Sequence, residues 1–502
     1  MPYSTLQLAL LASTAGELQQ QLHALVQEHT GRLVEVVMKL LLSELTPQAS
    51  FQFEEELGDA GRELLRVITE WAYNECEADD PEAMPPIIRF EGGQYRRENK
   101  KTPNRDVSTR FGKITLWRFP YRYRQRGSEP GIFPLELLLG LTQGATPALA
   151  DSVARYMAET GASQARVLER LRREHAVGWG AERLRAVTAA KARAMDAFRH
   201  SYQVARVLAL LQKAYESRGN CKPVLALGRD GISVCRQPRG FWEVASVATV
   251  TVYDRSGNRL GTVYLARMPE LGQGELTDQL TRLIRDILHN WERPLPRLCY
   301  VTDAGANETR FYRKVLLNLR DPRRPSRRLQ WYRIVDYYHT TERITTMAEC
   351  LFGKNSKRGQ SWARRMRKLL LKSGGPSRVL HSAAALVGRK KKMGHERRKK
   401  FDTAYNYIRR RTHFMDYHGY RAMHLPIGSG ITEAACKTVF TQRMKLSGMR
   451  WKDAGGQAVL NLRVLLLSGI WELVRGASLQ AQQSLITVPD CHHDQHSQKT
   501  AA

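Results

Sequence analysis

The spacing of apolar positions changes along this chain of 502 residues and divides it into regions. From residue 6 to residue 71, apolar side chains recur every three to four positions, which predicts amphipathic helices. The same stretch and its continuation carry acidic clusters, at residues 54–56 and 75–82. We expect residues 1–100 to form a helical N-terminal region that packs or dimerises.

Residues 101–205 combine two patterns. Aromatic and basic residues interleave in a β-like stretch at 111–124, which predicts a β-hairpin that either has one basic face or contacts bases and phosphates. Residues 146–202 then predict three helices, with Ser163 as the N-cap of the second. This arrangement fits a helix-turn-helix and equally an ordinary three-helix bundle. We interpret the region as DNA-binding.

The period changes again from Cys221 onward, where short apolar runs predict strands. We expect a strand that ends at Asp230, two further strands of an antiparallel meander, and then strands that alternate with helices. The predicted strands cover residues 223–230, 241–253, 259–268, 296–303 and 330–336, and the predicted helices cover 276–291 and 308–319. The succession βββ-α-β-α-β-α is the ribonuclease H-like order, in which the first and fourth strands are neighbours.

The predicted fold class is therefore an α/β ribonuclease H-like core with a mixed five-stranded sheet and helices. A helical insertion interrupts this core, and mainly α-helical N-terminal domains precede it. The first part of the core covers residues 206–339, the basic insertion 340–425, and the last part 426–480. We expect the polar tail at 481–502 to be disordered.

The net charge and the spacing of the cysteines indicate which binding partners and metal sites to expect. Lysine and arginine total 79 against 49 aspartate and glutamate, a net charge of +30, which indicates a polyanionic partner such as nucleic acid. No run of 18 apolar residues occurs, so we expect no membrane contact and a cytoplasmic, nucleoid-associated location. The 7 cysteines are scattered, without the spacing of a zinc site or a disulfide framework.

Three acids are candidates for phosphodiester chemistry. Asp230 and Asp303 each follow a predicted strand, and Glu433 opens a helix that Ser429 can cap. Two divalent ions about 3.5–4 Å apart can activate a water or a 3′-hydroxyl and stabilise the leaving oxygen, and Mg²⁺ takes hard oxygen ligands. The alternatives are a turn aspartate before glycine and a capped helix in which Glu433 pairs with Lys437.

Several motifs together resemble bacterial insertion-sequence DDE transposases of the ISKra type. They are Gly-Arg-Asp-Gly at 228–231, Val-Thr-Asp-Ala-Gly-Ala at 301–306, Asp-Tyr-Tyr-His at 336–339, Pro-Ile-Gly-Ser-Gly-Ile-Thr-Glu-Ala-Ala-Cys-Lys at 426–437, the segment 443–451 and Asn-Leu-Arg at 461–463. The resemblance covers residues 146–476. A Cys-x-x-Cys pair that such proteins often carry before residues 135–141 is replaced here by Tyr-Arg-Tyr-Arg-Gln-Arg.

The resemblance implies a catalytic triad of Asp230, Asp303 and Glu433 that holds Mg²⁺ or Mn²⁺. It also implies that Asp336 and His339 lie near the active site, where His339 either orients a phosphate or is a core residue. The expected activity is cleavage at the terminal inverted repeats of an insertion sequence and joining of the freed 3′-hydroxyls to target DNA.

We expect the protein to bind double-stranded DNA as a homodimer or higher oligomer. The candidate DNA-binding residues are Lys437, Arg443, Lys445, Arg450, Trp451, Arg389, Lys390, Lys391, Lys392, Arg397, Arg398, Lys399 and Lys400, of which Trp451 would stack on a base. The alternatives are a non-catalytic DNA-binding protein derived from a transposase and a ribonuclease H-like nuclease or resolvase.

Overall fold

The computed structural model describes residues 3, 5, 8, 12, 14–123, 131–238, 240–388, 393–482 and 486–489. The chain forms two compact units, one of residues 1–197 with 475–502 and one of residues 198–474. Each unit is described by itself below.

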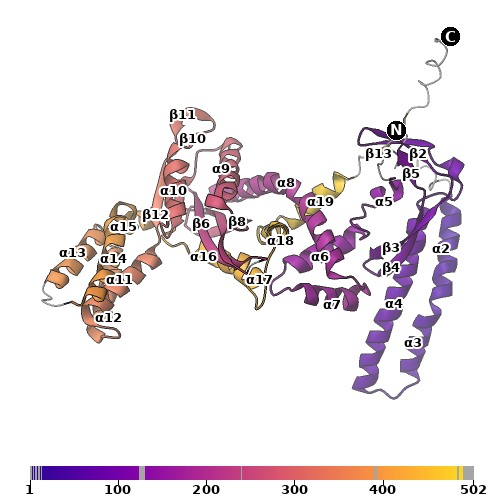
Figure 1. The fold of residues 1–502 in the computed structure, drawn as a ribbon, viewed down its shortest axis with the longest axis horizontal. Coiled ribbons are helices and arrows are strands. Elements are labelled where there is room, and N and C mark those ends of the chain that lie inside the picture. Colours follow the sequence, from indigo (N-terminus) through magenta and orange to yellow (C-terminus); the bar gives the residue numbers. More distant parts are fainter. Residues whose placement is uncertain are drawn as a thin grey trace, which may run out of the picture. The chain divides into compact units, whose positions relative to one another are not determined.

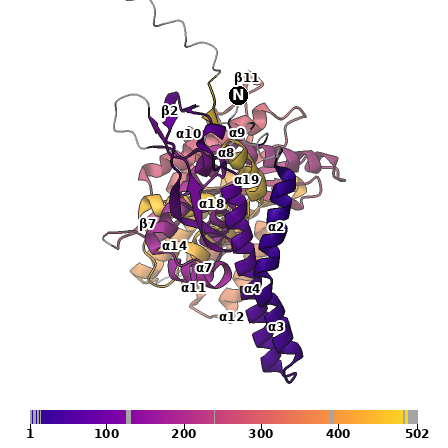
Figure 2. The same ribbon diagram turned by 90° about the vertical axis from the view of Figure 1, so that its right-hand side faces the viewer.

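Three helices of the first unit pack together, with α2 (Ala15–His29) and α3 (Gly31–Leu41) following one another along the length of α4 (Pro47–Glu75) (Figures 1 and 2). The hydroxyl of Thr46 accepts the backbone N–H of Ala49 and so caps α4. The helical expectation for this region is correct up to Glu75, but it misses two strands, β1 (Ile87–Phe90) and β2 (Gly93–Arg97).

The strands of the first unit form a small sheet and a hairpin. The sheet has the order β13-β1-β2-β5, with β5 at Tyr121–Tyr123 and β13 at Ile486–Thr487. The hairpin joins β3 (Thr102–Thr109) to β4 (Gly112–Arg118), so the predicted hairpin begins before residue 111 and its partner strand is β3. Because β13 pairs with β1, two residues of the segment 481–502, expected to be disordered, are ordered.

Helices follow the hairpin, beginning with the short α5 (Pro134–Leu138). The three predicted helices are α6 (Pro147–Ala158), α7 (Gln164–His175) and α8 (Ala181–Glu216). Ser163 caps α7 as predicted, because its hydroxyl accepts the backbone N–H of Arg166 at 3.2 Å. The division between the two units falls within α8.

A mixed five-stranded sheet lies at the centre of the second unit, as predicted. Its strands are β6 (Val224–Cys235), β7 (Trp242–Tyr253), β8 (Arg259–Arg267), β9 (Arg297–Thr302) and β12 (Trp331–Val335), in the order β12-β9-β6-β7-β8. The first and fourth of these strands, β6 and β9, are parallel neighbours. The predicted end of the first strand is wrong, because pairing with β7 carries β6 past Asp230 to Cys235.

Helices cover both faces of this sheet. On one face, Leu225, Leu227 and Tyr300 pack with α9 (Gly274–His289), α10 (Ala306–Lys314) and the end of α8. On the other face, Ala226 and Val301 pack with the inserted helices, which Figure 1 shows gathered at the β12 edge. The inserted helices are α11 (Tyr337–Phe352), α12 (Lys357–Leu370), α13 (Gly375–Gly388), α14 (His395–Arg409) and α15 (Tyr417–Ala422).

The remaining elements of the second unit are short or come last in the chain. A strand pair, β10 (Arg320–Asp321) with β11 (Arg324–Arg328), follows α10 and was not predicted. The C-terminal elements are α16 (Gly430–Ala435), a π-helix η5 (Cys436–Thr441), α17 (Gln442–Met444), α18 (Asp453–Leu467) and α19 (Trp471–Gln480), of which α19 belongs to the first unit from Arg475 onward. No single helix in the described parts of the chain is long and apolar enough to cross a membrane, and only the bent pair α18 and α19 passes that test together.

Gly228 allows α16 to pack directly on the sheet. A Cβ atom at this position would collide with Oγ1 of Thr432 on α16 and would lie 2.8 Å from Oγ1 of Thr249 on β7. The two threonine hydroxyls are hydrogen-bonded to each other at 2.9 Å. The absence of a side chain at residue 228 therefore sets the height of α16, which carries Glu433, above the sheet.

We expect Gly228→Ala to lower the free energy of unfolding by about 1–3 kcal/mol, the range for inserting a methyl group into a packed contact. Thr432→Ala removes the colliding oxygen and should recover part of that loss in the double variant, so a thermal-denaturation cycle should show coupling. Gly274→Ala is the matched control, since a Cβ there meets nothing within 4 Å. Additive losses from the two substitutions would contradict this account of the packing.

Candidate metal centre

Three aspartates occupy equivalent positions on three neighbouring parallel strands. Leu227 of β6 lies opposite Tyr300 of β9, and Asp230 and Asp303 each stand three residues further along. Thr302 of β9 lies opposite Val335 of β12, and Asp303 and Asp336 are the next residue on each strand. Because neighbouring strands are about 4.8 Å apart, the register brings the three aspartates to the same end of these strands, where the parallel pairing stops.

Asp230 is held by one donor at each oxygen. The backbone N–H of Gly231 donates to Oδ1 at 2.7 Å, and the thiol of Cys436 donates to Oδ2 at 3.3 Å. Burial raises the pKa of Asp230, these two hydrogen bonds lower it, and the charges of Asp303 and Glu433 raise it further, with a net upward shift. The predicted triad is therefore close enough for its charges to interact.

Asp303 lies in the turn after β9, and the inserted helix α14 fastens this turn. The backbone N–H of Gly305 donates to Asp303 Oδ1 at 2.9 Å. From α14, the hydroxyl of Tyr407 donates to the carbonyl oxygen of Asp303 at 2.6 Å, and the guanidinium of the following Arg411 donates to the carbonyl oxygen of Ala304 at 3.3 Å. Burial raises the pKa of Tyr407 to about 12, so its phenol stays a donor at neutral pH.

Asp336 is fully buried and connects β12 and α11 to the segment before α16. Its Oδ1 accepts the backbone N–H of His339 at 2.7 Å, which caps α11. Its Oδ2 accepts the backbone N–H of Ser429. The same segment is bound a second time, because the backbone N–H of Tyr337 donates to the carbonyl oxygen of Ile427 at 2.9 Å.

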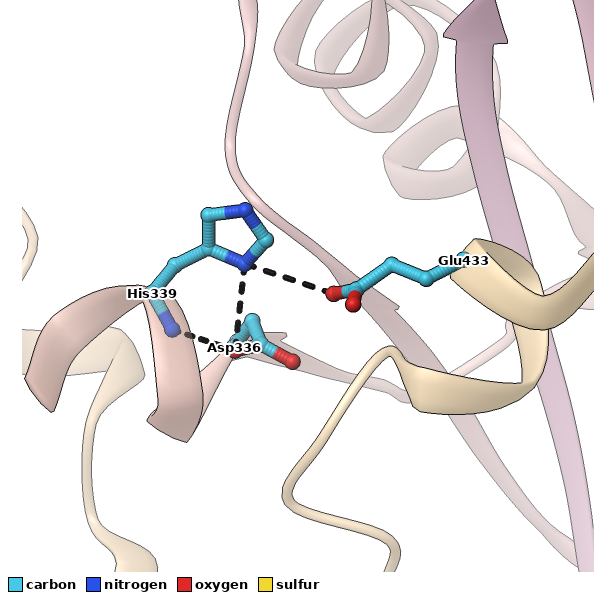
Figure 3. Close-up of side chains that lie close together, drawn as sticks. All are labelled: Asp336, His339 and Glu433. Atoms are coloured by element: carbon cyan, nitrogen blue, oxygen red, sulfur yellow. Dashed lines mark hydrogen bonds and ion pairs between the residues drawn. The ribbon is translucent and has the colours of Figure 1, made fainter. Parts of the chain in front are cut away.

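Glu433 and His339 meet above this buried carboxylate, as Figure 3 shows. Nδ1 of His339 lies 3.3 Å from Asp336 Oδ1 and 3.5 Å from Glu433 Oε1. Ser429 occupies the N-cap position of α16, but its hydroxyl donates to Glu433 Oε1 at 2.7 Å instead of accepting a backbone N–H. Burial alone lowers the pKa of His339, but the negative charges of Asp336 and Glu433 reverse this and raise it.

Among the residues that the structure describes, Asp336, His339 and Glu433 form the group that can hold a metal ion, with one ligand atom from each within 4.8 Å of the others. Asp230 and Asp303 lie outside that limit although their charges act on the same region. Thus Asp336 and His339, expected to lie near the triad, lie close to its glutamate, and His339 is at ion-pair distance from Glu433.

Sequence reasoning missed a fifth acid, Glu308. It lies in the first turn of α10, five residues after Asp303, and is buried. Burial raises its pKa, as do the charges of Asp303 and Asp230, while Arg229 opposes the rise. A Cβ at Gly305 would collide with Glu308 Oε2 and lie 3.4 Å from Asp303 Oδ1, which places the two carboxylates on the same side of the turn. Its signal in the sequence was a helix-start acid close behind a strand-end acid.

Two of the predicted DNA-binding residues are buried. Arg443 and Trp451 are 1% and 8% exposed and pack on each other, with the guanidinium carbon 5.1 Å from the ring centroid. The predictions that Arg443 contacts phosphate and that Trp451 stacks on a base are therefore wrong for this structure. Lys437 and Arg450 are exposed, and Lys445 is half-buried with its ammonium 5.4 Å from the ring of Trp242.

Basic residues of the insertion line a hollow of about 610 Å³ beside the turn that holds Asp303. Tyr407 and Arg411, which bond to that turn, also line the hollow. The predicted residues Arg397, Arg398, Lys399 and Lys400 are exposed on α14, and Arg398 forms an ion pair with Asp402. Arg389, Lys390, Lys391 and Lys392 lie outside the described residues. The basic residues that line the hollow are Arg343, Arg398, Lys399, Arg410 and Arg411.

Comparison of the chain with protein-family models and with curated proteins gives no match in either case.

The raised pKa of Glu308 predicts a pH-dependent penalty in the metal-free protein. A carboxyl group whose folded pKa lies above its unfolded value favours folding below about pH 4, and this contribution is lost as the pH rises through the folded pKa. We expect Glu308→Gln to raise the melting temperature at pH 7 in EDTA, with a gain that shrinks toward pH 4. The exposed Glu292→Gln is the control. A Glu308→Gln protein less stable than wild type at pH 7 would show that the charge is needed for folding.

Proposed function

We propose that the chain is a DNA transposase with a ribonuclease H-like catalytic core. In this proposal it binds the terminal inverted repeats of its element, hydrolyses the phosphodiester at each end and joins the freed 3′-hydroxyls to target DNA. The observation that supports it most is that Asp230, Asp303 and Asp336 lie where the parallel pairing of β6, β9 and β12 ends, with Glu433 of α16 close to Asp336. A parallel pair of strands with an acid just beyond the paired residues of each fits this type of core.

Asp230, Asp303 and Glu433 are the proposed ligands of divalent ions, Mg²⁺ or Mn²⁺. When bound, such a pair of ions supplies an activated water or 3′-hydroxyl and a stabilised leaving oxygen. The surrounding residues aim the ligands. Gly231 and Cys436 fix the two oxygens of Asp230, and Ser429 fixes one oxygen of Glu433. The raised pKa of Asp230 fits a site of clustered carboxylates whose charges a bound cation would neutralise.

The hollow on the insertion is the proposed path for a DNA strand. Its five basic residues can hold phosphates, and its aromatic residue Tyr407 bonds to the turn of Asp303. A strand in this hollow would lie beside the turn that holds Asp303. We also propose that the exposed Lys437 and Arg450, with the half-buried Lys445, contact phosphates beside Glu433.

The proposed partners are double-stranded DNA and a second copy of the chain, in the nucleoid of a bacterial cytoplasm. The net charge of +30 supports the DNA partner. Support for self-association comes from the α3 and α4 hairpin, where apolar side chains are exposed, among them Val34, Leu41, Leu42, Leu45 and Phe51 at 59–81%.

Glu433→Gln should abolish both end cleavage and strand joining, because it keeps size and hydrogen-bonding capacity but removes a charge that a divalent ion requires. We expect a loss of at least about a hundredfold in rate, the upper end of the effect of disturbing a metal site. Gel assays with radiolabelled element ends and a target plasmid would measure both steps. The control, Glu349→Gln, changes an exposed glutamate on α11 and should cut and join normally.

A Glu433→Gln protein that cuts at the wild-type rate would refute the assignment of the third acid. Cutting by the wild type without any strand joining would indicate a nuclease or resolvase instead of a transposase. Binding of DNA by the wild type without any cutting would indicate a non-catalytic DNA-binding protein derived from a transposase.

Neutralising the hollow should change the salt dependence of DNA binding. Each phosphate contact contributes about 0.9 to the slope of log K against log salt. In fluorescence-anisotropy titrations, the double variant Lys399→Gln with Arg410→Gln should therefore have a negative slope that is less steep by about 2. Arg282→Gln with Arg285→Gln, on α9 at the opposite face of the sheet, is the control pair. Equal slopes for both double variants would show that the hollow does not carry the strand.

A further inference from the structure

The distances from His339 Nδ1 to the carboxylate oxygens of Asp336 and Glu433 are closer to those between two ligands of one metal ion than to a hydrogen-bond length. A hydrogen bond between nitrogen and oxygen is most often about 2.9–3.0 Å long. The distances from His339 Nδ1 to Asp336 Oδ1 and Glu433 Oε1 are longer, at 3.3 and 3.5 Å. Ligands about 2.1 Å from one ion at tetrahedral angles are about 3.4 Å apart. The two pairs that include His339 are thus spaced as ligands of one tetrahedral ion such as Zn²⁺, and all three donor atoms lie within 4.8 Å of one another.

Nδ1 of His339 is also left without a hydrogen bond. It is buried from solvent and makes no hydrogen bond of acceptable geometry within the described residues, although two carboxylates face it. Its contacts with the two carboxylates are ion pairs of 3.3 and 3.5 Å, which satisfy a buried nitrogen poorly, so such an atom calls for an explanation. An ion placed between the nitrogen and the carboxylate oxygens would satisfy it.

The three ligands are held in place by groups that do not compete for the ion. Asp336 is oriented by the backbone N–H groups of His339 and Ser429. The hydroxyl of Ser429 orients Glu433. Each carboxylate oxygen in these bonds has a second lone pair free, and Glu433 has a second oxygen as well. This is the supporting shell that a preorganised ion site requires.

We propose that Asp336, His339 and Glu433 form a mixed nitrogen and oxygen site that selects a divalent transition ion, such as Mn²⁺ or Zn²⁺, over Mg²⁺. Imidazole nitrogen is a good ligand for transition ions, whereas Mg²⁺ takes oxygen ligands and keeps several waters. In this site His339 is a direct ligand of the ion. Its two carboxylate ligands are Asp336 and Glu433, and neither Asp230 nor Asp303 takes part. This assignment rests on the proposed function only in that Glu433 serves both the ion and the reaction.

The test is Mn²⁺ binding to the full chain in the absence of DNA. Electron paramagnetic resonance of free Mn²⁺ gives the affinity, and electron spin-echo modulation detects coupling of bound Mn²⁺ to ¹⁴N. We expect a nitrogen-coupled Mn²⁺ in the wild type that a tenfold excess of Mg²⁺ does not displace. His339→Gln should abolish the nitrogen coupling and weaken Mn²⁺ binding at least tenfold, with less than a twofold change for Mg²⁺.

His381→Gln is the matched control, since it removes an exposed histidine from α13 of the same insertion. It should leave the affinity and the coupling unchanged, and circular dichroism of both variants verifies folding. Bound Mn²⁺ without nitrogen coupling, or equal affinity of wild type and His339→Gln, would overturn the proposal and make His339 an ion-pair partner of Asp336.

The proposed function can fail separately. A protein that binds nitrogen-coupled Mn²⁺ but never cuts element ends would support the ion site and refute the transposase function. A protein that cuts and joins DNA with Mg²⁺ and binds Mn²⁺ without nitrogen coupling would support the transposase function and refute the ion site.

Discussion

The buried carboxylate of Asp336 is the constraint on which the site depends. A fully buried charge is stable only when hydrogen bonds and opposite charge replace its lost hydration. Here two backbone N–H groups supply those bonds, one from α11 and one from the segment before α16. Satisfying this one side chain therefore brings together the end of β12, the start of the insertion and the helix that carries Glu433.

The acids are crowded on one side of the sheet, and two buried arginines lie toward its other side. Arg229 and Arg333 precede Asp230 and Asp336 by one and three residues, and both are 3% exposed. Arg229 is held by Gln273 and Thr277, and the guanidinium carbon of Arg333 lies 4.5 Å from the ring of Tyr300. Burial lowers the pKa of both arginines, and the charge of Glu308 opposes this. Their positive charge partly offsets the repulsion among the carboxylates.

The order of the strands could be predicted because each carries a local signal, an apolar run bounded by turn residues. The nearness of Asp230 and Asp303 followed from that order, whereas Glu433 was assigned from the helix start at residues 428–433 and from the family resemblance. What could not be predicted depends on tertiary contacts. The extension of β6 past Asp230 requires pairing with β7, and the burial of Arg443 and Trp451 depends on how the segment after α16 folds back. Glu308 was missed because a helix-start acid is common, and only its burial beside Asp303 distinguishes it.

The fastening of the Asp303 turn by α14 has a consequence for how this protein can evolve. Tyr407 and Arg411 belong to the insertion, yet they hold the backbone of the second acid and its neighbour. An insertion exchanged between homologues at its chain boundaries would bring a foreign helix to this turn and leave two carbonyl oxygens without their donors. The inserted helices and the core are thus one heritable unit, and substitutions in α14 are expected to be compensated in the turn after β9.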